Sequence, residues 1–208
     1  TGYRVSAGYG LATVYALMRD RKFLTDTACI CTVMDYIAAK LCGVPVTQMH
    51  TTNAASLGIY DAEKQTFDAE ALCKIGIRPT LLPKVSNTVG IIGRYCGIPV
   101  TLPIGDNQAS VLGSVSDLCD TVLINIGTGS QVSVGTENYH DVSGSIELRP
   151  CVEGTSLLVG SGLCGGRAYA LWEQFLRSFA VRCGMPEESR YDVLNALAEE
   201  GLEPTLVN

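Results

Sequence analysis

The chain has 208 residues, of which 47% are hydrophobic and 17% are charged. This composition excludes a disordered chain and indicates a folded globular protein. Lys and Arg total 15 against 21 for Asp and Glu, which gives a net charge of -6, so nucleic acid is not an expected partner.

No segment of the sequence has the features of a membrane anchor or an export signal. Apolar runs stay short of the roughly twenty residues that cross a bilayer, and the first residues lack a basic stretch followed by an apolar core. Nine cysteines are scattered without a Cys-x-x-Cys pair and only two histidines occur, so no metal ligands are assigned. We expect a cytoplasmic protein with reduced, mostly buried thiols and no membrane partner.

The first third of the chain is predicted to be mostly helical. Residues 10–20 and 32–43 carry apolar side chains at helical spacing, and Gly43 is expected to end the second helix. Residues 56–77 indicate a short strand, a turn around Asp61 to Gln65 and a helix that Asp68 caps. The side chains expected to face the core are Leu11, Val14, Tyr15, Leu17 and Met18 in the first helix and Val33, Met34, Ile37, Ala38 and Leu41 in the second.

The rest of the chain is richer in strand signals. After Pro83, Gly and Pro residues indicate short extended pieces, and residues 121–134 predict a hairpin with a glycine-containing loop. A strand over residues 156–161 is followed by an amphipathic helix from about Arg167, whose apolar face includes Trp172 as a core residue. Another helix is expected from Pro186. This order predicts an α/β protein with two lobes that meet near residues 100 to 120.

The first candidate for chemistry is the segment Gly105 to Ser110, "GDNQAS". Asp106 would accept a proton from an attacking hydroxyl, while Asn107 or Gln108 would bind neighbouring hydroxyls of a polyhydroxylated substrate. The alternative is that Asp106 and Asn107 only form a turn and cap a helix that begins near Gln108. Taken alone, the segment favours this alternative.

The second candidate is Asn125 to Ser130, "NIGTGS". Gly127 and Gly129 allow backbone N–H groups to turn toward one point, and Thr128 adds a hydroxyl, so the loop could hold an anion without a basic side chain. A simple hairpin turn is the alternative. The order of the two segments, with an apolar strand between them, favours a functional site over a simple hairpin turn.

This order resembles the centre of the FGGY family of carbohydrate kinases. The segments that carry the resemblance are "GDNQASVLGSVSDLCDTVLINIGTGSQVSV" and, upstream, "GLATVYALMRD", "TVMDYIAAKLCG" and "TTNAASLGIYDAEKQTFDAEAL". They are most similar to the members that phosphorylate sedoheptulose, and the match runs with interruptions from about Gly8 to Phe175.

The resemblance implies a two-lobed α/β fold of the actin-like, ribonuclease-H-like kind that binds ATP, Mg²⁺ and a sugar. Residues 1–115 would be the later part of the N-terminal sugar-binding lobe, and residues 116–208 the start of the C-terminal nucleotide-binding lobe. The roles it implies are Asp106 as catalytic base, Asn107 and Gln108 as substrate contacts, and Gly127, Thr128, Gly129, Gly165 and Gly166 as nucleotide contacts.

Other interpretations stay open beside this one. Gly160, Gly162 and Gly165 spell G-x-G-x-x-G, but an NAD-binding fingerprint needs an acid after a second strand, and the following sequence is helical. We expect these glycines to form a strand-to-helix turn whose free N–H groups face a nucleotide. Xylulose, ribulose or glycerol could be the substrate instead, a non-catalytic binding protein is a further alternative, and a homodimer is left open.

One motif of actin-like kinases is not found in this sequence. Such kinases begin with a Gly-x-Asp-x-Gly-Thr segment whose acid holds Mg²⁺, and nothing similar precedes "TGYRVSAGYG". We therefore expect an internal part of a longer kinase, with the Mg²⁺-binding acid and the adenine pocket elsewhere. The 208 residues alone are expected to have little or no kinase activity.

Overall fold

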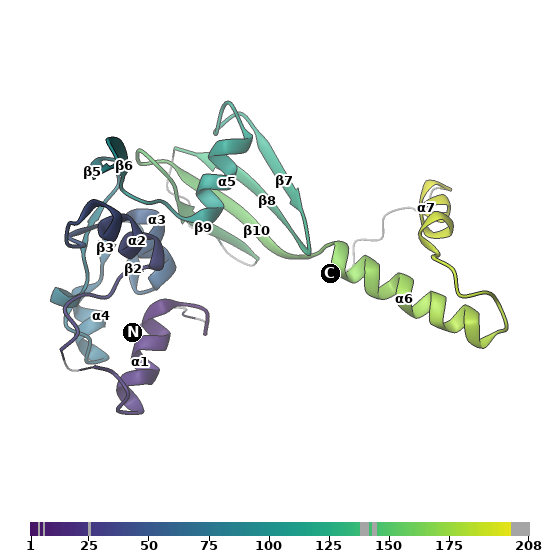
Figure 1. The fold of residues 1–208 in the computed structure, drawn as a ribbon, viewed down its shortest axis with the longest axis horizontal. Helices are drawn as coiled ribbons and strands as arrows, with labels where there is room; N and C mark the ends of the chain where they lie inside the picture. The colour runs from purple at the N-terminus through teal and green to yellow at the C-terminus, as the bar shows by residue number, and fades with distance from the viewer. Residues whose placement is uncertain (4, 6, 25, 138–141, 143–144, 201–208) are drawn as a thin grey trace. The chain divides into compact units, whose positions relative to one another are not determined.

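The computed structural model describes residues 1–3, 5, 7–24, 26–137, 142 and 145–200 (Figure 1). Its helices are α1 (Gly10–Arg19), α2 (Val33–Cys42), α3 (Thr51–Leu57), α4 (Ala69–Lys74), the 3-10 turn η1 (Pro79–Leu81), α5 (Asp106–Ser114), α6 (Gly166–Arg182) and α7 (Tyr191–Glu199). Its strands are β1 (Gln48–His50), β2 (Tyr60–Asp61), β3 (Thr66–Phe67), β4 (Lys84–Ser86), β5 (Ile91–Tyr95), β6 (Ile98–Thr101), β7 (Val122–Ile126), β8 (Gly129–Thr136), β9 (Ile146–Pro150) and β10 (Ser156–Cys164).

The chain divides into two compact units. The first contains Thr1–Leu123 and Ser133–Val159, and the second contains Ile124–Val132 and the chain from Gly160 onward. A four-stranded sheet has the order β7-β8-β10-β9, and three two-stranded pairs complete the sheet structure. Of these, β1 and β4 are parallel, whereas β2–β3 and β5–β6 are antiparallel. The assignment of residues 1–115 and 116–208 to two functional lobes stays a prediction.

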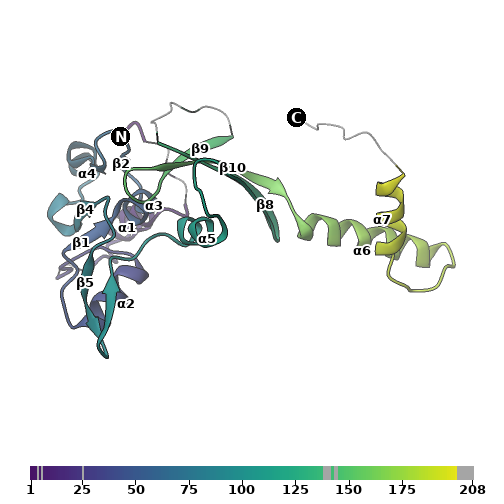
Figure 2. The ribbon, with the colours of Figure 1, turned by 90° about the horizontal axis from the view of Figure 1, so that it is seen from above.

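The first unit has two hydrophobic cores. One packs α1, α3 and α4 together around Leu11, Met49, Leu72 and Ile77, none of which is more than 1% exposed. The other packs Val111 of α5 against Cys151, Leu157 and Val159, which are 0–1% exposed. Figure 2 shows the β5 strand beside α2 in the same unit. In the described part of the chain, no helix has both the length and the apolar character that a membrane span requires.

Most predicted elements are present, and one helix was missed. The helices expected at residues 10–20, 32–43 and from Arg167, the hairpin over residues 121–134 and the strand from Ser156 are confirmed. Helix α3 was not predicted, because its seven residues are too few to show a helical period. The last helix begins at Tyr191 and not at Pro186.

The predicted inward faces of the first two helices were partly wrong. In α1, Leu11 is buried, but Tyr15 and Leu17 are 46% and 38% exposed. Helix α2 buries its polar Asp35 together with Ala38 and Ala39. Its bulky apolar side chains Val33, Tyr36, Ile37 and Leu41 are 44–67% exposed.

Two sets of contacts explain the orientation of α2. Thr32 and Asp35 form a capping box, in which the Asp35 N–H donates to Thr32 Oγ1 over 3.3 Å and the Thr32 N–H donates to Asp35 Oδ2 over 3.2 Å. The Thr32 hydroxyl also donates to Asp35 Oδ2, over 2.6 Å. The second carboxylate oxygen accepts from the buried Asn53 amide, at 3.3 Å. Because a buried carboxylate needs such partners, these bonds turn the Asp35 face of α2 toward α3.

The apolar face of α6 is also exposed within the described residues. Trp172 and Phe175 stack with ring centroids 5.7 Å apart, yet they are 54% and 59% exposed. The expectation that Trp172 is a core residue is therefore not met in this part of the chain. The helical period was read correctly, but the described residues supply no surface that covers it.

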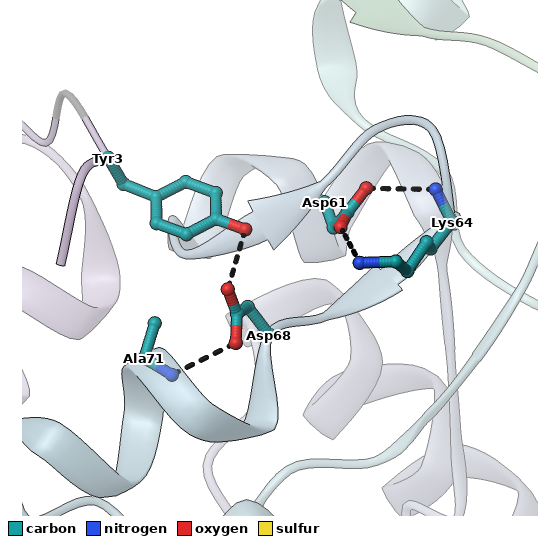
Figure 3. Close-up of polar contacts among 5 residues, drawn as sticks. All are labelled: Tyr3, Asp61, Lys64, Asp68 and Ala71. Atoms are coloured by element: carbon teal, nitrogen blue, oxygen red, sulfur yellow. Dashed lines mark hydrogen bonds and ion pairs between the residues drawn. The ribbon is translucent and has the colours of Figure 1, made fainter.

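Local capping follows the sequence closely around α4 (Figure 3). The Ala71 N–H donates to Asp68 Oδ1 over 2.9 Å, which makes Asp68 the predicted cap, and the Tyr3 hydroxyl donates to Asp68 Oδ2 over 3.1 Å. Nearby, Asp61 closes the predicted turn by accepting from the backbone N–H and the Nζ of Lys64, both at 2.9 Å. The Ala71 N–H bond is the main reason that the pKa of Asp68 is lowered, and burial is the main reason that the pKa of Tyr3 is raised to about 12.

Replacement of the α4 cap should give a pH-dependent loss of stability. Asp68→Ala removes both bonds of the carboxylate, so we expect a lower melting temperature at neutral pH. Because the folded-state pKa of Asp68 lies below its ordinary value of 3.8, its stabilisation is complete above that value and is lost as the pH falls through the folded-state pKa. The difference in melting temperature between the wild type and the variant should therefore stay constant from neutral pH down to about pH 4 and shrink as the pH is lowered further.

The control for this experiment is Asp26→Ala, which removes an exposed aspartate that lies outside any helix. It should leave the melting temperature nearly unchanged at every pH. A difference between wild type and Asp68→Ala that is the same at acidic and neutral pH would contradict the capping role.

Candidate active site

The start of α5 presents the predicted catalytic acid to solvent. Gly105, with φ -62° and ψ 147°, is the N-cap, and the helix begins at Asp106 itself. The Asp106 side chain is exposed, and its Oδ1 accepts from the Asn107 N–H over 2.7 Å. The alternative in which Asp106 caps a helix that begins near Gln108 does not fit this geometry.

Asn107 is half-buried next to a cation that sequence reasoning missed. Arg149 of β9 lies with Nη1 3.4 Å from Asn107 Oδ1, and its Nη2 and Nε bind Glu147 Oε2 at 2.7 and 2.9 Å. An isolated arginine in a strand gives no sequence signal for this placement, because its neighbour Asn107 is 42 residues away. Because Arg149 contacts the amide oxygen of Asn107, the amide nitrogen Nδ2 can still donate to another group.

Gln108 lies in the interior and not on the exposed side of the helix. It is 5% exposed, and its Nε2 donates to the Pro150 carbonyl over 2.8 Å. This bond ties the first turn of α5 to the end of β9. The observed contact of Gln108 is thus structural, and its binding to a sugar hydroxyl stays a prediction.

Residues of α3 hold the chain that leads into Asp106. Asn53 Nδ2 donates to the Pro103 carbonyl over 3.1 Å, and the Gly105 N–H donates to Thr52 Oγ1 over 2.9 Å. Thr52 and Asn53 are 3% and 0% exposed. These buried bonds restrict the backbone immediately before the exposed carboxylate.

A pocket of the first unit lies near this segment but does not include it. Its volume is about 310 Å³, and it is lined on α2 by Asp35 and elsewhere by mostly apolar residues such as Ile91, Leu102 and Pro103. None of Asp106, Asn107 and Gln108 lines it. We therefore assign the candidate site to the exposed start of α5 and not to this pocket.

The glycine loop of the second unit packs on the start of α6. Gly127 donates its N–H to the Gly129 carbonyl over 2.8 Å, which closes the predicted turn, and Thr128 is exposed at its tip. The Gly166 N–H donates to the Gly127 carbonyl over 2.8 Å, and the Arg167 N–H to the Thr128 carbonyl over 3.4 Å. The expectation that the α6 N-terminus offers free N–H groups was wrong for these two, because the loop carbonyls already occupy them.

Gly165 is required by this packing. A Cβ at this position would lie 2.6 Å from the Gly129 carbonyl carbon and 2.7 Å from the Gly127 carbonyl oxygen. Backbone atoms cannot move aside as a flexible side chain can, so only glycine allows the loop and the helix to approach this closely. The structure thus brings together Gly127 to Gly129, Gly165 and Gly166, all of which were predicted as nucleotide contacts.

A metal site is not formed by the described residues alone. Among them, no group of three or more His, Cys, Asp or Glu side chains is arranged to hold an ion. We therefore assign no Mg²⁺ ligand to the described part of this chain.

Comparisons with known proteins identify relatives of the chain. No protein-family model matches the sequence. Sedoheptulokinases from Mus musculus and Homo sapiens are each 30% identical to it over 199 residues, which are 88% of this chain but 42% and 41% of theirs. An apulose kinase from Pectobacterium atrosepticum is 24% identical over 185 residues. The chain is homologous to sugar kinases of the FGGY family. It spans about two fifths of the length of these curated relatives.

Solved sugar-kinase structures confirm the predicted fold class. A xylulose kinase from Rhodospirillum rubrum matches 94% of this chain with a TM-score of 0.73 and 20% identity, and the match is 41% of that protein. A xylulose kinase from Lactobacillus acidophilus matches 92% with a TM-score of 0.71, also at 20% identity. This FGGY homologue therefore has part of the actin-like, two-lobed sugar-kinase fold.

The close approach at Gly165 can be tested by comparing alanine substitutions at two glycines, Gly165 and Gly160. Gly165→Ala should lower stability by about 1–3 kcal/mol, because its methyl group would overlap the loop backbone. Gly160→Ala is the matched control, since a Cβ there meets nothing within 4 Å. Thermal and urea unfolding of the two variants measure the effect. Equal stability of both variants would show that the loop does not rest on Gly165 as described.

Proposed function

We propose that this chain contributes the catalytic base to an ATP-dependent kinase that phosphorylates a terminal hydroxyl of a ketose, with sedoheptulose as the substrate and sedoheptulose 7-phosphate as the product. The observation that carries the proposal is the exposed Asp106 carboxylate at the start of α5. It lies in a chain that is 30% identical to sedoheptulokinases over 88% of its length.

Asp106 is proposed to accept the proton of the attacking sugar hydroxyl. Its side chain is exposed and therefore accessible to a substrate, and a carboxylate can accept a proton as a general base. Asn107 is proposed to donate from Nδ2 to a neighbouring hydroxyl, because Arg149 contacts its Oδ1. Gln108 supports both residues by holding the first turn of α5 on Pro150.

The glycine loop is proposed to hold the phosphates of ATP, which supplies the γ-phosphoryl group. Thr128 is exposed at the tip of a turn whose flanking glycines, Gly127 and Gly129, carry no side chains, so a phosphate could approach the backbone closely. Gly165 and Gly166 then act indirectly, because their observed contacts are with the loop. Mg²⁺ would accompany the nucleotide, with no ligand assigned from the described residues.

A different sugar or polyol is the second candidate substrate. Apulose kinase is among the curated relatives, and xylulose, gluconate and glycerol kinases are among the structural ones. An NAD-binding site receives no support, because among the described residues α6 is followed by another helix and not by a strand that ends in an acid. A cytoplasmic location stays a prediction. The nine cysteines are free, but the expectation that most of them are buried was wrong, because five are exposed and one, Cys151, is buried.

The proposal predicts sugar-dependent ADP release that requires Asp106. With Mg·ATP, the complete protein should release ADP in the presence of sedoheptulose, and Asp106→Asn should lower kcat by about 10²–10⁴-fold because the general base is lost. The panel includes xylulose, ribulose, glycerol and a reaction without sugar. Nucleotide binding by Asp106→Asn, measured by calorimetry, should stay near that of the wild type.

Asp192→Asn provides a matched control, because it also removes an acid from the first turn of a helix but lies in α7. It should keep the wild-type kcat. Stimulation by another sugar would change only the substrate assignment. Nucleotide binding without sugar-stimulated ADP release would contradict the kinase proposal and favour a binding protein.

A further inference from the structure

A buried chain of hydrogen bonds runs from the residue before Asp106 to a histidine. The Gly105 N–H lies 2.9 Å from Thr52 Oγ1, and this oxygen lies 2.9 Å from His50 Nδ1. The Thr52 N–H also points at His50 Nδ1, at 3.3 Å. All three residues are buried, and the His50 side chain is 0% exposed.

The direction of each bond follows from the groups involved. A backbone N–H can only donate, so Thr52 Oγ1 accepts from the Gly105 N–H and His50 Nδ1 accepts from the Thr52 N–H. Because Nδ1 is thus an acceptor, the Thr52 hydroxyl is the donor of its bond with His50. Nδ1 of His50 then accepts from both the hydroxyl and the N–H of Thr52, which places the ring proton of neutral His50 on Nε2. Burial lowers the pKa of His50, while the backbone of Asn87 and the charge of Asp35 act in the opposite direction.

We propose that Thr52 is a positioning residue for the base Asp106: its hydroxyl, oriented by His50, fixes the Gly105 N–H and thereby the start of α5. This inference rests on the proposed function, because it assigns a catalytic purpose to a bond that is described here as structural. No site role was predicted for Thr52 or His50, which lie more than fifty residues before Gly105.

The surroundings of Gly105 leave its N–H few other partners. The residue is buried, and a Cβ built on it would lie 2.5 Å from Gln108 Oε1 and 3.6 Å from Thr52 Cβ. Loss of the Thr52 hydroxyl would leave the N–H without a partner or force the backbone to shift toward water. A shift of the Gly105 backbone would displace the Cα of Asp106, because the two residues are joined directly.

The chain contains a closely matched control position. Thr51 is the preceding residue of the same helix and is 1% exposed, yet its hydroxyl has no hydrogen-bond partner among the described residues. Thr51→Val and Thr52→Val therefore make the same chemical change at the same depth. They differ in whether a hydrogen bond toward Gly105 is removed.

The test measures kcat and KM of Thr52→Val, Thr52→Ser and Thr51→Val in the complete protein, by sugar-dependent ADP release. Thr52→Val should lose about 10²-fold in kcat with little change in the KM for ATP, because the base is displaced from the sugar hydroxyl. Thr52→Ser should recover most of the lost kcat, since it restores the hydroxyl. Thr51→Val should remain close to the wild type.

Two outcomes of this assay would overturn the inference. One is a Thr52→Val variant with the kcat of the wild type. The other is an equal loss in Thr52→Val and Thr52→Ser, which would assign the effect to altered packing at this position and not to the hydroxyl. A melting curve for each variant separates unfolding from loss of turnover.

A wild type without sugar-dependent ADP release would instead refute the proposed function. In that case, amide hydrogen exchange at Gly105 and Asn107 still tests whether Thr52 holds the backbone at the start of α5. Both amides should exchange faster in Thr52→Val than in Thr52→Ser and Thr51→Val. Equal protection in the three variants would show that Thr52 does not hold this segment.

Discussion

The hydrogen bond between the Gly105 N–H and the Thr52 hydroxyl joins two segments that lie 53 residues apart. Together with the bonds from Asn53 to Pro103 and from Gln108 to Pro150, it fixes the backbone on both sides of Asp106. Buried polar groups must find partners, so each of these bonds restricts where the chain can run. The outcome is an arrangement in which the backbone is held from the interior while the carboxylate faces solvent, as a base that must reach a substrate requires.

The second unit uses backbone packing for a similar purpose. The turn of Gly127 to Gly129 rests on the first residues of α6, and its carbonyl oxygens accept from the Gly166 and Arg167 N–H groups. This contact explains the glycine at position 165 without a dinucleotide, since any Cβ there would overlap the turn. The G-x-G-x-x-G spacing therefore reflects a strand-to-helix junction that packs against a hairpin, and the exposed part of the turn is left for a ligand.

Much of the local structure could be predicted from short-range patterns. The caps at Gly43 and Asp68, the turn at Asp61 and the hairpin around Thr128 depend on residues within a few positions of one another, and all four are present. Helical periodicity likewise located α1, α2 and α6. It could not tell which face of α2 is buried, because the capping box and the bond to Asn53 turn Asp35 inward. A period identifies an apolar face but does not identify the surface that covers it.

The sequence by itself determined the family resemblance, the order of most helices and strands, and the acid, amide and glycine segments that are proposed to act on sugar and ATP. These properties depend on residues that are close together in the sequence, so local propensity and motif spacing are enough to predict them. Only the tertiary structure decided that Gln108 points inward, that Arg149 contacts Asn107 and that Thr52 and His50 lie behind Gly105. Each of these contacts joins residues more than forty positions apart, so it exists only once packing has brought the separate segments together.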